Sequence, residues 1–258
     1  MKQLFYLIFI QILILLFIGS CIPPTIQKQV ILDNHGAIIR MDTSERMIYL
    51  VFTGHEYAEG FSVINNALEK HNIKASFFFT GDFYRNTDFE EIIKTIKIGG
   101  HYLGAHSDKH LLYNSWEKRD SLLVSKEEFM KDLSDNYDEM KRLGIIKENA
   151  EYFLPPYEWY NSQIATWTTE ANFKLINFTP GTSSNQDWTF PNPGSYYISS
   201  DTILLNILNY EENKGMNGFI LLSHIGTDPR RIDKFYFKMD TMIHMLKQRG
   251  YDFSSLVD

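Results

Sequence analysis

The stretch from residue 47 to residue 80, MIYLVFTGHEYAEGFSVINNALEKHNIKASFFFT, sets the fold because its hydrophobic pattern changes twice. Residues 47–53 are a continuous apolar run rich in β-formers, which indicates a strand buried on both faces. Residues 61–71 place apolar side chains at helical spacing, and Asn72 ends that helix. Residues 74–80 form a second apolar run, so the pattern predicts a strand, a crossover helix and a parallel strand.

The same alternation continues to the end of the chain. Further strands are predicted at 102–105, 152–154, 174–177, 218–223 and 251–253, and helices at 89–98, 126–143, 162–171, 201–213 and 235–249. Strands that alternate with helices imply parallel pairing, and roughly seven such units predict an α/β fold, a distorted (β/α) barrel. No linker divides residues 45–258, so this range is expected to form one domain.

The composition excludes several classes of protein. The 258 residues include 25 Lys+Arg and 32 Asp+Glu, a net charge of −7, which argues against a non-specific nucleic-acid binder. One cysteine permits neither an intramolecular disulfide nor a multi-cysteine metal site. Metal chemistry would therefore rely on the eight histidines and the carboxylates.

The N-terminus has the pattern of an export signal. A charged start, an apolar run over residues 4–18 that is short for a membrane span, and small residues at 19–20 describe a signal peptide. The sequence Ile18-Gly-Ser-Cys21 resembles the bacterial lipobox. We expect a lipoprotein signal peptide at 1–20, a lipidated Cys21 that starts a tether over 21–44, and an exported protein anchored to a bacterial membrane. A plain signal peptide or an anchor helix with an incidental cysteine is the alternative.

Histidines gather where the predicted strands end. In βα barrels the active site forms at the carboxyl ends of the strands. His55, His106, His110 and His224 all follow predicted strands. His106 and His110 are four residues apart, so on a helical turn both imidazoles would share one face and suit one divalent ion. Such an ion needs about three protein ligands, and His55 or Glu56 could supply the third. A pair of exposed or capping histidines is the alternative.

Four phrases in order resemble the polysaccharide deacetylases, the NodB-homology carbohydrate esterases of family 4. Residues 104–110, GAHSDKH, are similar to their metal motif H-[ST]-x-x-H. Residues 72–78, NIKASFF, are similar to the phrase N-V-K-A-T-F-F of the second strand. Residues 221–224, LLSH, resemble the late L-x-H motif, and residues 246–253 match the closing phrase of the domain. The resemblance covers residues 47–253 and implies a distorted barrel of seven units.

The resemblance also implies a reaction. A divalent ion, usually zinc, polarises the acetamide carbonyl and a bound water, and a carboxylate takes the proton of that water. His224 would be the general acid that protonates the leaving amine. The implied substrate is an N-acetylated polysaccharide, such as peptidoglycan or another glycan that contains N-acetylglucosamine, and the product is acetate.

The chain departs from the family at the first motif, T-F-D-D. Thr53 and Gly54 align with the two aspartates that serve as base and metal ligand, and neither residue can replace them. We expect His55 to be the third metal ligand and Glu56 to be the base. There are two alternatives. His55 would support the site without binding the metal, and Glu56 would be a solvated carboxylate on the loop.

The third and fourth motifs are partly kept. Residues 154–158 read LPPYE where relatives have R-P-P-Y-G, so the arginine that orients the base is missing. Tyr157 keeps the position whose backbone N–H helps to form the oxyanion hole. Trp188 resembles the residue that walls the acetate pocket, and Asp187 would tune His224 or replace the lost base. Packed aromatics at Tyr157 and Trp188 and a loop turn at Asp187 are the alternatives.

Two hypotheses follow from these motifs. The first is an N-deacetylase that depends on a divalent metal ion, with zinc expected. It would be anchored to the membrane by its lipid and act on an N-acetylated polysaccharide. The second is a catalytically impaired homologue that binds glycan as a lipoprotein. Neither nucleic acid nor a protein partner is expected. The positions of His55 and Glu56 relative to His106 and His110 distinguish the two hypotheses.

Overall fold

The computed structural model describes residues 29–192 and 196–257. The predicted signal peptide at 1–20 and the lipidation site Cys21 lie outside these residues. Within the part of the chain that is described, none of the helices combines the length and the apolar character needed to cross a membrane.

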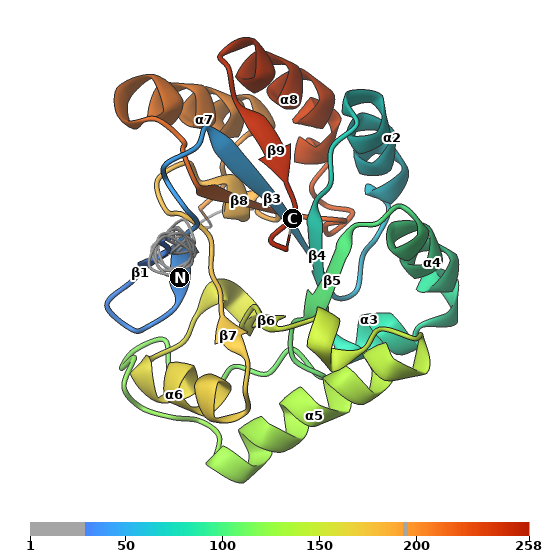
Figure 1. The fold of residues 1–258 in the computed structure, drawn as a ribbon, viewed down its shortest axis with the longest axis vertical. Coiled ribbons are helices and arrows are strands. Elements are labelled where there is room, and N and C mark those ends of the chain that lie inside the picture. The colour runs from blue at the N-terminus through green and yellow to red at the C-terminus, as the bar shows by residue number, and fades with distance from the viewer. Residues whose placement is uncertain (1–28, 193–195, 258) are drawn as a thin grey trace, which may run out of the picture.

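One sheet of nine strands occupies the middle of the molecule (Figure 1). Its order is β1 (Ile31–Leu32), β2 (Ile38–Arg40), β8 (Phe219–His224), β3 (Met47–Gly54), β4 (Ser76–Phe79), β5 (Tyr102–Ala105), β6 (Tyr152–Phe153) and β7 (Lys174–Leu175), and β9 (Asp252–Ser254) pairs with β3. Neighbouring strands from β8 to β7 run parallel. Ile38 of β2 also forms a bridge with Ile176, just past β7, so the row of strands curls back on itself. The predicted α/β barrel is confirmed.

Helices surround the strands (Figure 1). They are α2 (Phe61–His71), α3 (Gly81–Arg85), α4 (Glu90–Ile98), α5 (Lys126–Arg142), α6 (Ser162–Glu170), α7 (Ser200–Lys214) and α8 (Met239–Gln248). Short 3-10 turns lie at Thr87–Phe89, Lys147–Asn149, Pro156–Glu158, Ser184–Gln186 and Phe235–Lys238. The ends follow local chemistry: α5 begins in a capping box of Ser125 and Glu128, and α2 ends at Asn72 with a left-handed φ of 50°.

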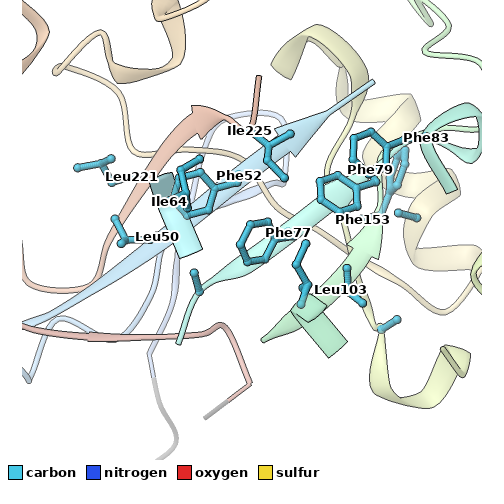
Figure 2. Close-up of a cluster of buried hydrophobic side chains, with 14 of the residues drawn as sticks. Leu50, Phe52, Ile64, Phe77, Phe79, Phe83, Leu103, Phe153, Leu221 and Ile225 are labelled. Carbon is cyan, nitrogen blue, oxygen red and sulfur yellow. The ribbon is translucent and has the colours of Figure 1, made fainter. Parts of the chain in front are cut away.

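The strands are buried on both faces, as their unbroken apolar runs predict. Along β3, Leu50 and Phe52 belong to the larger cluster of buried side chains, whereas Tyr49 and Val51 belong to a second cluster on the other face. Figure 2 shows the larger cluster, where Phe52 and Phe77 lie against each other with ring centroids 5.1 Å apart. Burial of each such side chain contributes about 1.5–3 kcal/mol, so the strand ends that carry the site rest on a rigid base.

The folded unit begins earlier than the sequence predicts. Residues 31–32 and 38–40 were predicted as part of a tether that runs to residue 44, but they form β1 and β2 of the sheet. Ala37 and Ile38 are buried, so the boundary at residue 45 is wrong. With two and three residues, these strands are too short to show a strand period in the sequence. The five-residue helix α3, which is capped by the Thr80 side chain, is missed for the same reason.

Candidate active site

Strand register brings the predicted site residues to one edge of the sheet. Gly54 pairs with Phe79, Phe79 with Ala105, and Ala105 with Phe153, so the strands β3 to β6 end level with one another. On the other side of β3, Thr53 pairs with His224. The residues that follow these strands therefore meet at the carboxyl edge, which is where βα barrels carry their active sites.

A pocket of about 640 Å³ opens at this edge, a volume that suits a small ligand or part of a larger one. Its wall includes His55 and Glu56 after β3, His110 after β5, Tyr157 and Glu158 after β6, Trp188 from the long loop, and His224 at the end of β8.

His106 is held in the form that can bind a metal ion. Its backbone N–H donates to the side-chain oxygen of Asn136 at 2.9 Å. Its ring Nδ1 lies 2.8 Å from the carbonyl oxygen of Leu154, and because a carbonyl only accepts, Nδ1 carries the proton and Nε2 keeps a lone pair. Burial, together with the neighbouring His224 and His55, lowers the pKa of His106 to about 3. The imidazole is therefore neutral near pH 7.

His110 stands beside His106, with ring centroids 5.1 Å apart. The segment between them is not the predicted helical turn but a loop, in which Ser107 and His110 have left-handed φ values of 72° and 55°. Buried Asp132 holds this loop because it accepts hydrogen bonds from the Lys109 backbone N–H and the Tyr113 hydroxyl. Burial and the nearby histidines lower the pKa of His110 to about 2.

His55 joins the pair only in part. Its ring centroid lies 4.9 Å from that of His110, but the two rings are nearly parallel, at 10°. Its Nδ1 is hydrogen bonded to the Thr80 hydroxyl at 3.0 Å, so Nε2 is the nitrogen left to bind an ion. Within residues 29–192 and 196–257, no group of three or more His, Cys, Asp or Glu side chains is arranged to hold a metal ion. The metal site of His55, His106 and His110 therefore stays a prediction, with the His55 and His106 ring centroids 4.9 Å and 5.1 Å from that of His110.

The end of β3 carries Thr53 and Gly54, at the positions where the resemblance implies two aspartates. The buried Thr53 hydroxyl has no hydrogen-bond partner. A Cβ atom on Gly54 would lie 2.8 Å from Ile225 and 2.9 Å from Phe79, which Figure 2 shows on either side of the strand end. A larger residue at position 54 therefore cannot be accommodated unless these neighbours move. Glu56, the predicted base, is exposed at the mouth of the pocket.

Asp187 and His224 form a dyad. One carboxylate oxygen of Asp187 lies 2.6 Å from Nδ1 of His224, and the other accepts the His224 backbone N–H at 2.9 Å. Burial alone would lower the pKa of His224, but the charge and the hydrogen bond of Asp187 raise it above its usual value. The structure thus brings Asp187 and His224 into contact, which is the arrangement that one of the roles predicted for Asp187 requires.

Hydrogen bonds from a buried arginine hold the loop that carries Asp187 and Trp188. The fully buried Arg231 donates hydrogen bonds to the carbonyls of Thr189 and Ile198. At the rim, Trp188 is 51% and Tyr157 44% exposed, so neither is the packed core aromatic that was the alternative. The Tyr157 ring contacts His110, with centroids 4.4 Å apart.

Glu158 is a site residue that the sequence analysis missed. It follows Tyr157, and both residues have left-handed backbone, with φ values of 60° and 53°. Left-handed geometry costs a non-glycine residue about 1–2 kcal/mol and tends to persist where function needs it. Burial raises the pKa of the Glu158 carboxyl to about 7, although His224 and a hydrogen bond from Asn185 act in the opposite direction. The one signal in the sequence was a carboxyl directly after a strand end.

Fold and site together define a hydrolase-type (β/α) barrel with histidines at its carboxyl edge. Residues 40–176 match the family model described as polysaccharide deacetylase, and the chain belongs to this family. It is 26% identical over 193 residues to a peptidoglycan-N-acetylglucosamine deacetylase of Bacillus cereus, covering 75% of this chain and 60% of that protein. It is 23% identical over 240 residues to the peptidoglycan-N-acetylmuramic acid deacetylase PdaA of Bacillus subtilis, covering 92% and 80%.

One similar solved structure is described as a pseudoenzyme. A CE4 family pseudoenzyme from Bacillus anthracis superimposes with a TM-score of 0.66 at 21% identity, covering 85% of this chain and 67% of that one. At this identity the likeness shows the fold alone. Membership of the family therefore does not by itself establish activity.

Proposed function

We propose that this protein is a metal-dependent N-deacetylase that removes acetyl groups from an N-acetylated polysaccharide and releases acetate. The observation that supports this most is the Asp187–His224 dyad, whose histidine lines the same pocket as His110. A buried carboxylate raises the pKa of His224, which favours the protonated imidazole that a departing amine needs. A protein that only binds glycan has no use for that proton.

The metal belongs to the proposal. His106 and His110 would hold a divalent ion, and zinc suits neutral imidazole ligands. Bound there, it would act as a Lewis acid and make a bound water more acidic. His55 stays a prediction as third ligand: its Nδ1 is hydrogen bonded to Thr80, which leaves Nε2 as the nitrogen that would bind the ion.

The remaining side chains bind and orient the substrate. Trp188 and Tyr157 are half exposed in the wall of the pocket, where their aromatic rings would stack on a sugar ring. The Tyr157 backbone N–H as oxyanion donor and Glu56 as base stay predictions. Peptidoglycan is the substrate class that we favour, because two relatives carry names of peptidoglycan deacetylases.

We also propose that the protein is exported and lipid-anchored at a bacterial membrane through Cys21. The lipobox-like sequence supports this. Replacement of Cys21 by alanine should release the protein from the membrane fraction; unchanged retention would refute lipidation.

The second candidate function is glycan binding without hydrolysis. The specific observation in its favour is the end of β3, where Thr53 and Gly54 replace the two aspartates and the space for a side chain at position 54 is filled.

One experiment separates the two candidates. Acetate release from N-acetylglucosamine oligomers and from peptidoglycan would be measured with and without zinc for wild type, His106→Ala and His244→Ala. His244 is exposed on α8 and serves as the matched control. The deacetylase proposal expects zinc-dependent release that His106→Ala abolishes and His244→Ala keeps. If no substrate yields metal-dependent acetate, the binding function replaces it.

A further inference from the structure

The deacetylase needs a base, and the end of β3 does not offer a buried one. Thr53 cannot take a proton near neutral pH, and Gly54 has no side chain. Glu56 lies exposed at the mouth, where water competes for its carboxylate. A base that acts on a water inside the pocket has to come from another strand end.

The end of β6 holds a carboxyl inside the pocket. Glu158 is partly buried in the wall that it shares with His55, His110 and His224. Its side chain accepts a hydrogen bond from Asn185 and lies within electrostatic range of His224. Glu158 therefore belongs to the same pocket as His110 and the proposed general acid His224.

The backbone indicates that this placement is selected. Tyr157 and Glu158 are consecutive residues with left-handed φ, a geometry that favours glycine. The turn is closed by the Glu158 N–H donating to the Pro155 carbonyl, and Asn177 donates to the Glu158 carbonyl. Glycine would meet these backbone requirements at lower cost, so the carboxyl itself accounts for a glutamate here.

We propose that Glu158 is the general base of this enzyme and replaces the aspartate lost from the end of β3. This inference rests on the proposed deacetylase function. Glu158 takes a proton from water while the water oxygen bonds to the acetamide carbon and the carbonyl π pair moves to its oxygen. When the carbonyl re-forms, the C–N bond breaks and the nitrogen receives the proton of His224. Acetic acid leaves and ionises, and the proton on Glu158 returns through solvent to His224.

The electrostatics agree with these roles. A general base works best when its pKa is close to the working pH, and burial raises the pKa of Glu158 to about 7. Asp187 raises the pKa of His224 as well, although burial opposes it. Near neutral pH one partner can accept a proton while the other can donate one.

The test compares two glutamates on either side of the same strand. Glu151 precedes β6 and forms a surface ion pair with Lys174 at 2.8 Å, so Glu151→Gln is the matched control. Glu158→Gln removes the basicity and keeps the shape, and Glu158→Gly removes the side chain where the backbone favours glycine. Each variant would be assayed for acetate release from N-acetylglucosamine oligomers with zinc, for bound zinc, and for melting temperature.

We expect both Glu158 variants to lose at least about a hundredfold in rate while they bind zinc normally. Glu158→Gly should melt at or above the temperature of wild type, and Glu151→Gln should keep the wild-type rate. The wild-type rate should fall as the pH drops below about 7, and this fall should be absent in the residual activity of Glu158→Gln.

Several results would overturn the role of Glu158. A Glu158→Gln rate within a few-fold of wild type would do so and leave the deacetylase function standing. Loss of zinc would show a ligand rather than a base, and loss of the fold in both variants would show a structural carboxyl. An inactive wild type would instead remove the deacetylase function, and the base with it.

Discussion

The ends of β5 and β3 lie two strands apart at the same edge of the sheet, yet they have diverged in opposite directions. After β5, His106 and His110 keep the family motif and are fixed by Asn136, Leu154 and buried Asp132. At the end of β3 stand Thr53 and Gly54; among the described residues the buried Thr53 hydroxyl has no hydrogen-bond partner, and Phe79 and Ile225 fill the space above Gly54.

The difference indicates that the pocket at the carboxyl edge can keep its polar residues even where the motif at one strand end differs from that of the family. A strand end that was merely damaged would leave a hole, but the end of β3 is packed closed. Meanwhile the ends of β6 and β8 contribute Glu158 and His224 to the same pocket, and Asp187 from the long loop is hydrogen bonded to His224. In a barrel every strand end faces the same space, so a proton acceptor can move from one strand to another without changing the fold.

The largest expected effect compares the contribution of the end of β5 to activity with that of the end of β3. His110→Ala should lower the rate of acetate release on the order of a thousandfold, because one of the two fitting ligands is lost. His55→Ala should lower it about tenfold, since His55 is held by Thr80 and not by the histidine pair. Zinc titration of both variants checks the reason. Equal losses would show that β3 still contributes as much as β5.

A smaller effect is expected at the dyad. Asp187→Asn should lower the pKa of His224, because the charge that raises it is gone. His224 would then be neutral at pH 7, and the rate should fall about a hundredfold. The alkaline limb of the pH–rate profile should move to lower pH. An unmoved limb would show that Asp187 acts on something other than His224.

The titration of Glu158 should also make the free energy of unfolding depend on pH. Its pKa is about 7 in the folded protein and near 4.5 when unfolded, so the folded state favours the protonated form. That contribution is complete below pH 4.5 and is lost as the pH rises to about 7. Glu158→Gln should therefore gain roughly 2–3 kcal/mol relative to wild type between pH 4.5 and pH 8, measured by urea unfolding. A difference independent of pH would mean that Glu158 is solvated.

The smallest expected effect tests whether the end of β3 has room for a side chain at position 54. Gly54→Ala should destabilise the protein by about 1–3 kcal/mol, because the new methyl group meets Ile225 and Phe79. Thermal unfolding would measure it, and Ser44→Ala on the exposed loop before β3 is a suitable control. An unchanged melting temperature would show that the strand end has room for a longer side chain.

The sequence predicted what depends on local pattern. Helix α2 and strand β5 were placed to the residue because apolar periodicity and the Asn72 stop mark them. His106 and His110 were paired correctly, but through a helical turn that is a loop with left-handed residues.

Glu158 and the position of His55 were not predictable in this way. The environment of Glu158 depends on Asn185 and His224, which are far from it in the chain, and on a left-handed backbone that no composition signal marks. The orientation of His55 depends on Thr80, at the end of a different strand.

The most direct test of the account follows free acetate by proton NMR at pH 7 with peptidoglycan fragments, zinc, and either wild type or Glu158→Gln. We predict steady acetate release by wild type and release at least about a hundredfold slower by the variant. No acetate from wild type, or equal rates from the two proteins, would contradict the claim that the chemistry has moved from the end of β3 to the end of β6.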